Sequence, residues 1–232
     1  LLKGCNFFYV YDNKVDNKKI PFFGDISPDF EPIWLINLNE CSVIDLNRAN
    51  KVDCQEISWN NLLNKKKIEN KNKVRIKNEL YNKDGSYEFT KSGWYRYNRG
   101  KTTLFIRQEV KGFSRYVGHH HHDFGHFVLF VNGKELFVDI GRKNYLSKDG
   151  VFPEFHNSIT VNNFGYLPRQ PHRYPLKYSQ CTNSIDSYIL NDSQVIEIST
   201  NGFSRLDKNL IFRRKLILNN ESLEITDELI GG

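Results

Sequence analysis

The chain has 232 residues, of which 39% are hydrophobic and 14% aromatic, so it can build a substantial folded core. Its formal net charge of +6 suits a polyanionic partner such as an acidic polysaccharide or a nucleic acid, although solvated lysine-rich faces carry the same charge. No apolar run approaches the ~20 residues that a transmembrane helix needs, so we expect no membrane span.

Methionine is absent from the chain, including from position 1. The first residues are too few and too polar for the apolar region of a signal peptide, and the last residues still have a strand pattern. We therefore expect a piece of a longer protein, cut within its last domain.

Residues 1–85 differ from the rest in pattern. A turn-rich connector ends at Pro32, which is well placed to open a short helix. Ser58 can cap a second helix, and the Lys- and Asn-rich residues 65–73 follow as an exposed helix end and linker. We predict a short helical segment and a linker over residues 1–85.

From residue 87 onward, the apolar residues recur with the period of two that is typical of β-strands. Asn132-Gly133 between two apolar runs predicts a tight hairpin, because both central residues of a type I′ turn take positive φ. Both strands of this hairpin are apolar on both faces, which predicts a position between two layers. The predicted strands are Tyr87–Thr90, Gly93–Tyr97, Thr102–Val110, Phe127–Val131, Glu135–Ile140, Ser158–Val161, Gln194–Thr200, Leu210–Leu218 and Ser222–Thr226. Many short strands without alternating helices predict an antiparallel β-sandwich over residues 86–232.

Four consecutive histidines precede an aspartate in the run from His119 to Asp123. Side chains alternate in direction along an extended segment, so His119, His121 and Asp123 share one face. His120 and His122 then point the other way. The first face presents two imidazoles and a carboxylate within reach of one ion or substrate. The opposite register stays open, and the HxHxD spacing favours the first.

Two later residues extend this set. Asp139 lies between apolar strand residues, where a bare buried carboxylate is costly, so it must be paired, hydrogen-bonded or metal-bound. His156 precedes another predicted strand. Two histidines and a carboxylate from separate strands form a donor set that zinc accepts. The alternatives are a turn-capping carboxylate and a hydrogen-bonded core histidine.

The segments Gly118 to Phe127, Phe137 to Gly141 and His156 to Ser158 together resemble the C-terminal β-sandwich of the heparinase II/III-like polysaccharide lyases. The resemblance implies a mainly β fold, an antiparallel sandwich preceded by the end of a truncated α/α toroid. Family members cleave uronate-containing acidic polysaccharides by β-elimination. The partners that the resemblance implies are such a polysaccharide and the missing N-terminal α/α domain.

The resemblance also implies roles for single residues. His119 matches the histidine that reaches into the active-site cleft. His121, Asp139 and His156 match the ligands of one structural zinc ion per chain. Asp123 would orient a histidine by accepting its other N–H. Because the family's catalytic tyrosine and its Asn or His partner lie on the toroid, we expect no turnover from this chain alone.

Other interpretations remain beside this one. Arg169 and Gln170 are candidate substrate contacts, with solvated loop positions as the alternative. A non-catalytic carbohydrate-binding or structural sandwich is a function of a different class. A cupin-like enzyme would need a Glu soon after the HxH pair, and a metallo-β-lactamase-like hydrolase would need histidine where Phe124 stands. No nucleic-acid-binding motif is present, so we expect no nucleic acid partner.

Overall fold

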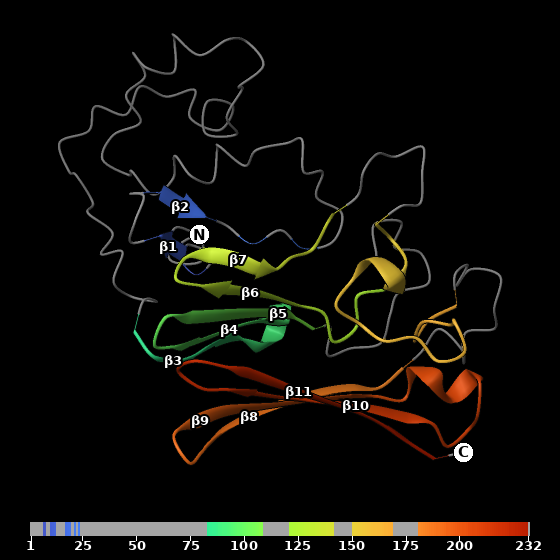
Figure 1. Cartoon of the computed structure of the whole chain (residues 1–232). Helices are drawn as coiled ribbons and strands as arrows, with labels where there is room; N and C mark the ends of the chain where they lie inside the picture. Colours follow the sequence, from blue (N-terminus) through green and yellow to red (C-terminus); the bar gives the residue numbers. More distant parts are fainter. Residues whose placement is uncertain are drawn as a thin grey trace, which may run out of the picture.

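The computed structural model describes residues 7, 10–12, 17–19, 21, 23, 83–108, 121–141, 150–168 and 181–231. Within these residues, two antiparallel sheets are stacked face to face (Figure 1). This confirms the predicted antiparallel β-sandwich. The helices expected after Pro32 and Ser58 lie outside the described residues. Within the described part, no helix has the length and apolar character that crossing a membrane requires.

The first sheet has five strands in the order β3-β4-β5-β6-β7, so strands that are consecutive in the chain are neighbours in the sheet. Its strands are β3 (Gly85–Phe89), β4 (Trp94–Arg99), β5 (Thr102–Arg107), β6 (Phe127–Val131) and β7 (Lys134–Phe137). The turn between β6 and β7 has φ of 53° at Asn132 and 74° at Gly133, as the sequence predicts for this hairpin.

The second sheet has four strands in the order β11-β10-β9-β8. Its strands are β8 (Asn183–Leu190), β9 (Ser193–Thr200), β10 (Ile211–Leu218) and β11 (Leu223–Ile230). Strand β8 is absent from the sequence prediction. The signal for it was present, because Asn191-Asp192 joins β8 to β9 with positive φ at both residues.

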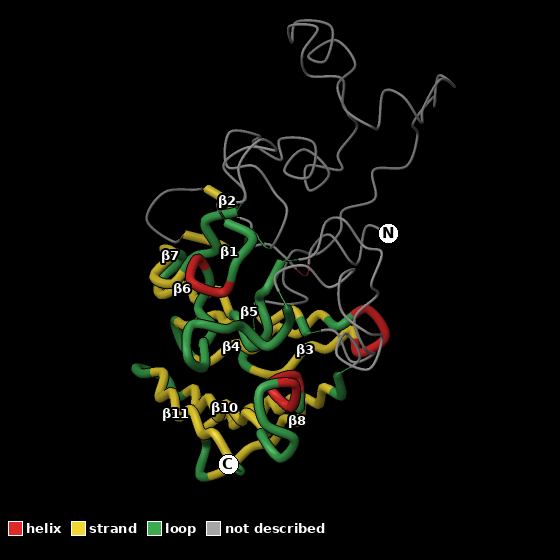
Figure 2. The backbone as a smooth tube through the Cα atoms, turned by 90° about the vertical axis from the view of Figure 1, so that its right-hand side faces the viewer, coloured by secondary structure: helices red, strands yellow, loops and turns green. Residues whose placement is uncertain are grey.

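The two sheets lie one above the other (Figures 1 and 2), and buried side chains from strands of both sheets form the main core. Alternate residues point inward along each inner strand, so one face of every strand supplies apolar side chains. The largest contributions come from Tyr97, Leu104, Ile106, Phe127, Ile196, Phe203, Phe212 and Leu216. Burial of this apolar surface stabilises the stacking of the sheets.

A second, smaller core lies on the opposite side of β5 and β6. Phe105, Val128 and Phe130 pack there with Phe7, Val10 and Phe23, and all six side chains are buried. The N-terminal residues also form the hairpin of β1 (Val10–Asp12) and β2 (Asn17–Lys19). The buried Arg96 donates from Nη1 to the backbone oxygen of Phe7 at 2.8 Å. Strand β6 is therefore buried on both faces, as predicted.

Two expectations about strands are wrong. β7 ends at Phe137, and all four of its residues are exposed, because it is the edge strand of its sheet. Residues 158–161 form no strand; their one ladder contact is an isolated bridge between Val161 and Phe164. Ser158 instead donates its hydroxyl to the backbone oxygen of Phe124 at 2.6 Å, so this segment bonds to a loop rather than to a neighbouring strand.

Candidate metal centre

Three buried side chains, His126, Asp139 and His156, meet beside the ends of β6 and β7. His126 closes a tight turn directly before β6, in which its backbone amide donates to the backbone oxygen of Asp123 at 2.9 Å. Asp139 comes two residues after β7. His156 ends the short 3-10 helix η3 (Pro153–Phe155). The cluster therefore joins three segments that are separate in the sequence.

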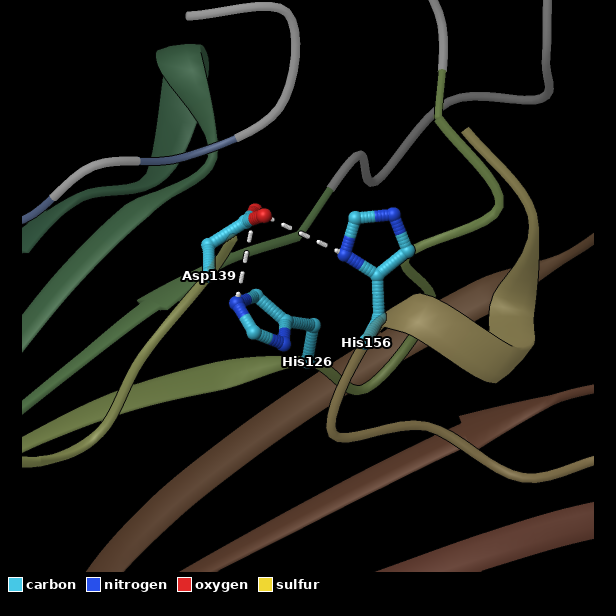
Figure 3. A group of neighbouring side chains, drawn as sticks. All are labelled: His126, Asp139 and His156. Atoms are coloured by element: carbon cyan, nitrogen blue, oxygen red, sulfur yellow. Dashed lines mark ion pairs between the residues drawn. The ribbon is translucent and has the colours of Figure 1, made fainter. Parts of the chain in front are cut away.

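Asp139 lies between the two imidazoles (Figure 3). Its Oδ2 is 3.5 Å from Nε2 of His126, and its Oδ1 is 3.5 Å from Nδ1 of His156. One nitrogen or oxygen atom from each residue lies within 4.8 Å of those of the other two. The exposed fractions are 1% for His126, 5% for Asp139 and 8% for His156, so water contributes little to their solvation.

The backbone after β7 holds the Asp139 carboxylate in place. The amide of Gly141 donates to Asp139 Oδ1 at 2.8 Å, and Gly141 takes a φ of 63°, which suits glycine. This local turn directs the carboxylate toward the histidines. It also ends the strand ladder, which explains why β7 is shorter than predicted.

Asn157 connects the three segments by hydrogen bonds. Its backbone amide donates to Nδ1 of His126 at 2.9 Å. Its side-chain amide donates to the backbone oxygens of Phe127 at 3.0 Å and Val138 at 3.4 Å. Its own backbone oxygen accepts a hydrogen bond from Arg214 of the second sheet. One asparagine thus links the residues on either side of the cluster.

Burial and charge shift the protonation of the cluster. Burial lowers the pKa of His126 to about 3, so the ring is neutral at physiological pH. Burial also acts to lower the pKa of His156, but contact with the Asp139 carboxylate outweighs it and raises that pKa above its ordinary value. Burial raises the pKa of Asp123 to about 6, although the charges of His156 and Arg107 oppose the shift.

The donor set and its burial fit a metal ion. Imidazole nitrogens and a carboxylate are the ligands that zinc takes from proteins. Nε2 of His126 and both ring nitrogens of His156 are buried and have no hydrogen-bond partner among the described residues. Buried polar atoms are nearly always paired, so a cluster of unpaired atoms has capacity for a ligand bound among them. The arrangement can therefore hold a metal through His156 and Asp139 together with a further nitrogen.

The predicted site residues are only partly within the described residues. Asp139 and His156 lie together as expected, and the ring centroid of His121 lies 5.3 Å from that of His156. The ring of His122 packs against those of Phe152 and Tyr166. His119, His120, Arg169 and Gln170 lie outside the described residues. The role of Asp123 as a hydrogen-bond acceptor stays a prediction.

His126 is the member of the cluster that sequence reasoning missed. It stands alone among apolar residues, in Phe124-Gly125-His126-Phe127. The cost of burying a polar group singled out Asp139, and the same argument applies to a histidine inside an apolar run. That signal was available and would have added His126 to the set.

Two stacked antiparallel sheets define a β-sandwich domain. Its buried cluster of two histidines and an aspartate is a candidate metal site. Residues 83–232 match the family described as Heparinase II/III-like, C-terminal, and the chain belongs to this family. No curated protein sequence matches the chain.

Solved structures share the fold. The heparan sulfate lyase HepC from Pedobacter heparinus superposes with a TM-score of 0.54 at 16% identity, covering 97% of this chain and 31% of that one. A heparinase III with methylated lysines gives a TM-score of 0.54 at 19% identity, covering 98% of this chain and 30% of that one. The chain therefore spans less than a third of the length of these structures.

Proposed function

We propose that the chain is part of a polysaccharide lyase that cleaves a uronate-containing acidic polysaccharide by β-elimination. The observation that carries this proposal is the family match over residues 83–232. The solved structures with the same fold, which include enzymes named heparan sulfate lyases, support it. The formal charge of +6 suits a polyanionic substrate.

In this reaction, a base removes the C5 proton of the uronate, and the bond from C4 to the glycosidic oxygen breaks. A C4–C5 double bond forms, and the leaving oxygen takes a proton. Positive or hydrogen-bonding groups near the uronate carboxylate make the C5 proton easier to remove, because charge develops there in the transition state. His119 would supply one such group in the cleft, and Arg169 and Gln170 would contact the substrate. The base and acid belong to the preceding α/α domain.

The same proposal assigns a structural zinc site to His121, Asp139 and His156. The 3.5 Å approach of Asp139 Oδ1 to Nδ1 of His156, and the ring of His121 beside that of His156, support this set. When bound, zinc would cross-link the segments that carry these residues. Asp123, which lies close enough to His156 for its charge to act on that ring, would help to orient it.

An assay on the full-length protein tests the catalytic part. Wild-type protein should release unsaturated uronate, detected by its ultraviolet absorbance, from at least one polymer in a panel that starts with heparan sulfate. His119→Ala should lower the rate by about 100-fold or more and keep its metal, measured by elemental mass spectrometry. His120→Ala is the matched control, because its side chain should point away from the cleft.

Two outcomes would contradict the proposal. Loss of activity in His120→Ala, with normal activity in His119→Ala, would reverse the register of the histidine run. Saccharide binding without any unsaturated product would favour the non-catalytic carbohydrate-binding sandwich.

A further inference from the structure

The position of the ring proton on His126 follows from its neighbours. Nδ1 of His126 accepts a hydrogen bond from the backbone amide of Asn157 at 2.9 Å. A backbone amide can only donate, so Nδ1 carries no proton. A neutral imidazole has one N–H, and this proton must therefore be on Nε2.

Nε2 of His126 faces the carboxylate of Asp139. The distance from Nε2 to Oδ2 is 3.5 Å, and both side chains are buried (Figure 3). This distance is at the upper limit of a hydrogen bond, and Nε2 of His126 has no hydrogen-bond partner among the described residues. A proton on Nε2 lies beside the negatively charged oxygen, and the attraction between them where water is excluded favours a closer approach. Ring nitrogens bind metal through an unprotonated lone pair. Neither nitrogen of His126 offers one in this arrangement.

The amide of Asn157 is itself held firmly. The side chain of Asn157 is bonded to the backbone oxygens of Phe127 and Val138, and its carbonyl is bonded to Arg214. Releasing Nδ1 of His126 for a proton would require this segment to move. The tautomer with the proton on Nε2 is therefore built into the local fold.

We propose that His126 is a positioning residue that donates from Nε2 to Asp139 and orients this carboxylate toward the metal, without being a metal ligand itself. This inference rests on the proposed metal site at Asp139 and His156. Carboxylates and histidines that bind metals are commonly held by such a neighbouring hydrogen bond, and removing it costs about 10- to 100-fold in metal affinity.

Zinc binding to the purified full chain, measured by competition with a fluorescent chelator, tests the role of His126. His126→Gln keeps an N–H donor near the position of Nε2 and should retain one zinc per chain, with nearly wild-type affinity. His126→Leu removes the donor and should bind zinc about 10- to 100-fold more weakly. His156→Gln, the matched control at a proposed ligand, should lose the zinc.

A spectroscopic measurement separates positioning from a general structural role. Nitrogen-15 NMR of the histidine rings should show a proton on Nε2 and none on Nδ1 of His126, before and after zinc is added. With cadmium-113 in place of zinc, the rings of ligating histidines should show coupling to the metal, and His126 should show none.

The failures of the two proposals can be distinguished. Wild-type protein that binds no zinc would contradict the metal site, and the inference about His126 would fail with it. If the wild type binds zinc and both His126→Gln and His156→Gln lose zinc binding completely, only the positioning role of His126 is contradicted. Cadmium coupling at His126 would do the same.

Discussion

Arg214 carries a buried positive charge from the second sheet to the loops around the candidate metal centre. Its Nε and Nη2 each donate to the carboxylate of Asp227 at 2.7 Å. Its Nη1 donates to the backbone oxygen of Gly125 at 2.8 Å and to that of Asn157. Because the side chain is 5% exposed, these acceptors replace the water that would otherwise solvate the charge.

Removing this guanidinium should destabilise the protein strongly. Arg214→Ala leaves two loop oxygens without their donor and removes the partner of Asp227, which is 31% exposed, and should lower the free energy of unfolding by about 2–4 kcal/mol in urea denaturation. Lys215→Ala is the matched control on the same strand. Lys215 lies 3.7 Å from Glu197 with both side chains well exposed, so its loss should cost less than about 1 kcal/mol. Equal effects would contradict the structural role of Arg214.

The β6–β7 hairpin shows how one turn positions a site residue. Asn132 and Gly133 both take positive φ, and Val131 pairs with Lys134 across the turn. The register that the turn sets continues to the next pair, and a bulge then shifts it, so that Leu129 pairs with Phe137. Strand β7 ends there, two residues before Asp139. The turn and the bulge together therefore determine where the carboxylate leaves the sheet.

Substitutions at the two central residues of this turn should affect the free energy of unfolding differently. Gly133→Ala places a Cβ in a left-handed conformation and should lower the free energy of unfolding by about 1–2 kcal/mol. Asn132→Gly, at a φ of 53°, should leave it nearly unchanged, because glycine accepts that conformation readily. Thermal unfolding of both variants tests this, and a larger loss in Asn132→Gly would show that the turn conformation is not the source.

On the scale of the whole molecule, the candidate metal centre joins segments that are far apart in the sequence and connects them to the second sheet. The turn before β6, the end of β7 and the helix η3 all contribute to it, and Arg214 connects it to the other sheet. An ion bound there would stabilise the folded state over the unfolded state by its binding free energy.

Chelation should therefore lower the melting temperature. At a metal concentration 100 times the dissociation constant, binding adds about 2.7 kcal/mol to the free energy of unfolding. For a protein of this size, that should correspond to a fall of about 5–10 °C when a chelator removes the metal, measured by scanning calorimetry. His156→Ala should melt at the same temperature with and without chelator. A chelator effect that persists in this variant would place the metal elsewhere.

The sandwich was predictable because its inner strands have clear apolar alternation and the β6–β7 turn has a specific sequence. Strand β8 was not predicted, since it is an edge strand in which Ser and Asp interrupt the apolar residues and most positions are exposed. Residues 158–161 have an apolar alternation of their own. Their polar neighbours, however, bond to loop carbonyls, which a local pattern does not reveal.

Part of the candidate site was predictable for a similar reason. Asp139 is conspicuous because a carboxylate in an apolar strand needs a partner, and His156, directly before a predicted strand, completed a donor set that zinc accepts. The contact between His126 and the amide of Asn157 joins residues 31 positions apart, and no local pattern specifies that they meet. The tautomer of His126, and hence its role, required the three-dimensional structure.

The second core also bears on the order in which the molecule can assemble during synthesis. Phe7 is synthesised well before its partners, since its side chain is buried against Phe105 and its backbone oxygen is bonded to Arg96, 89 residues later. Phe130 completes the same core, so the N-terminal residues cannot be buried until β6 has been made. Phe7, Val10 and Phe23 must therefore wait, with their apolar side chains available to chaperones or to other chains, until the residues up to Phe130 have emerged.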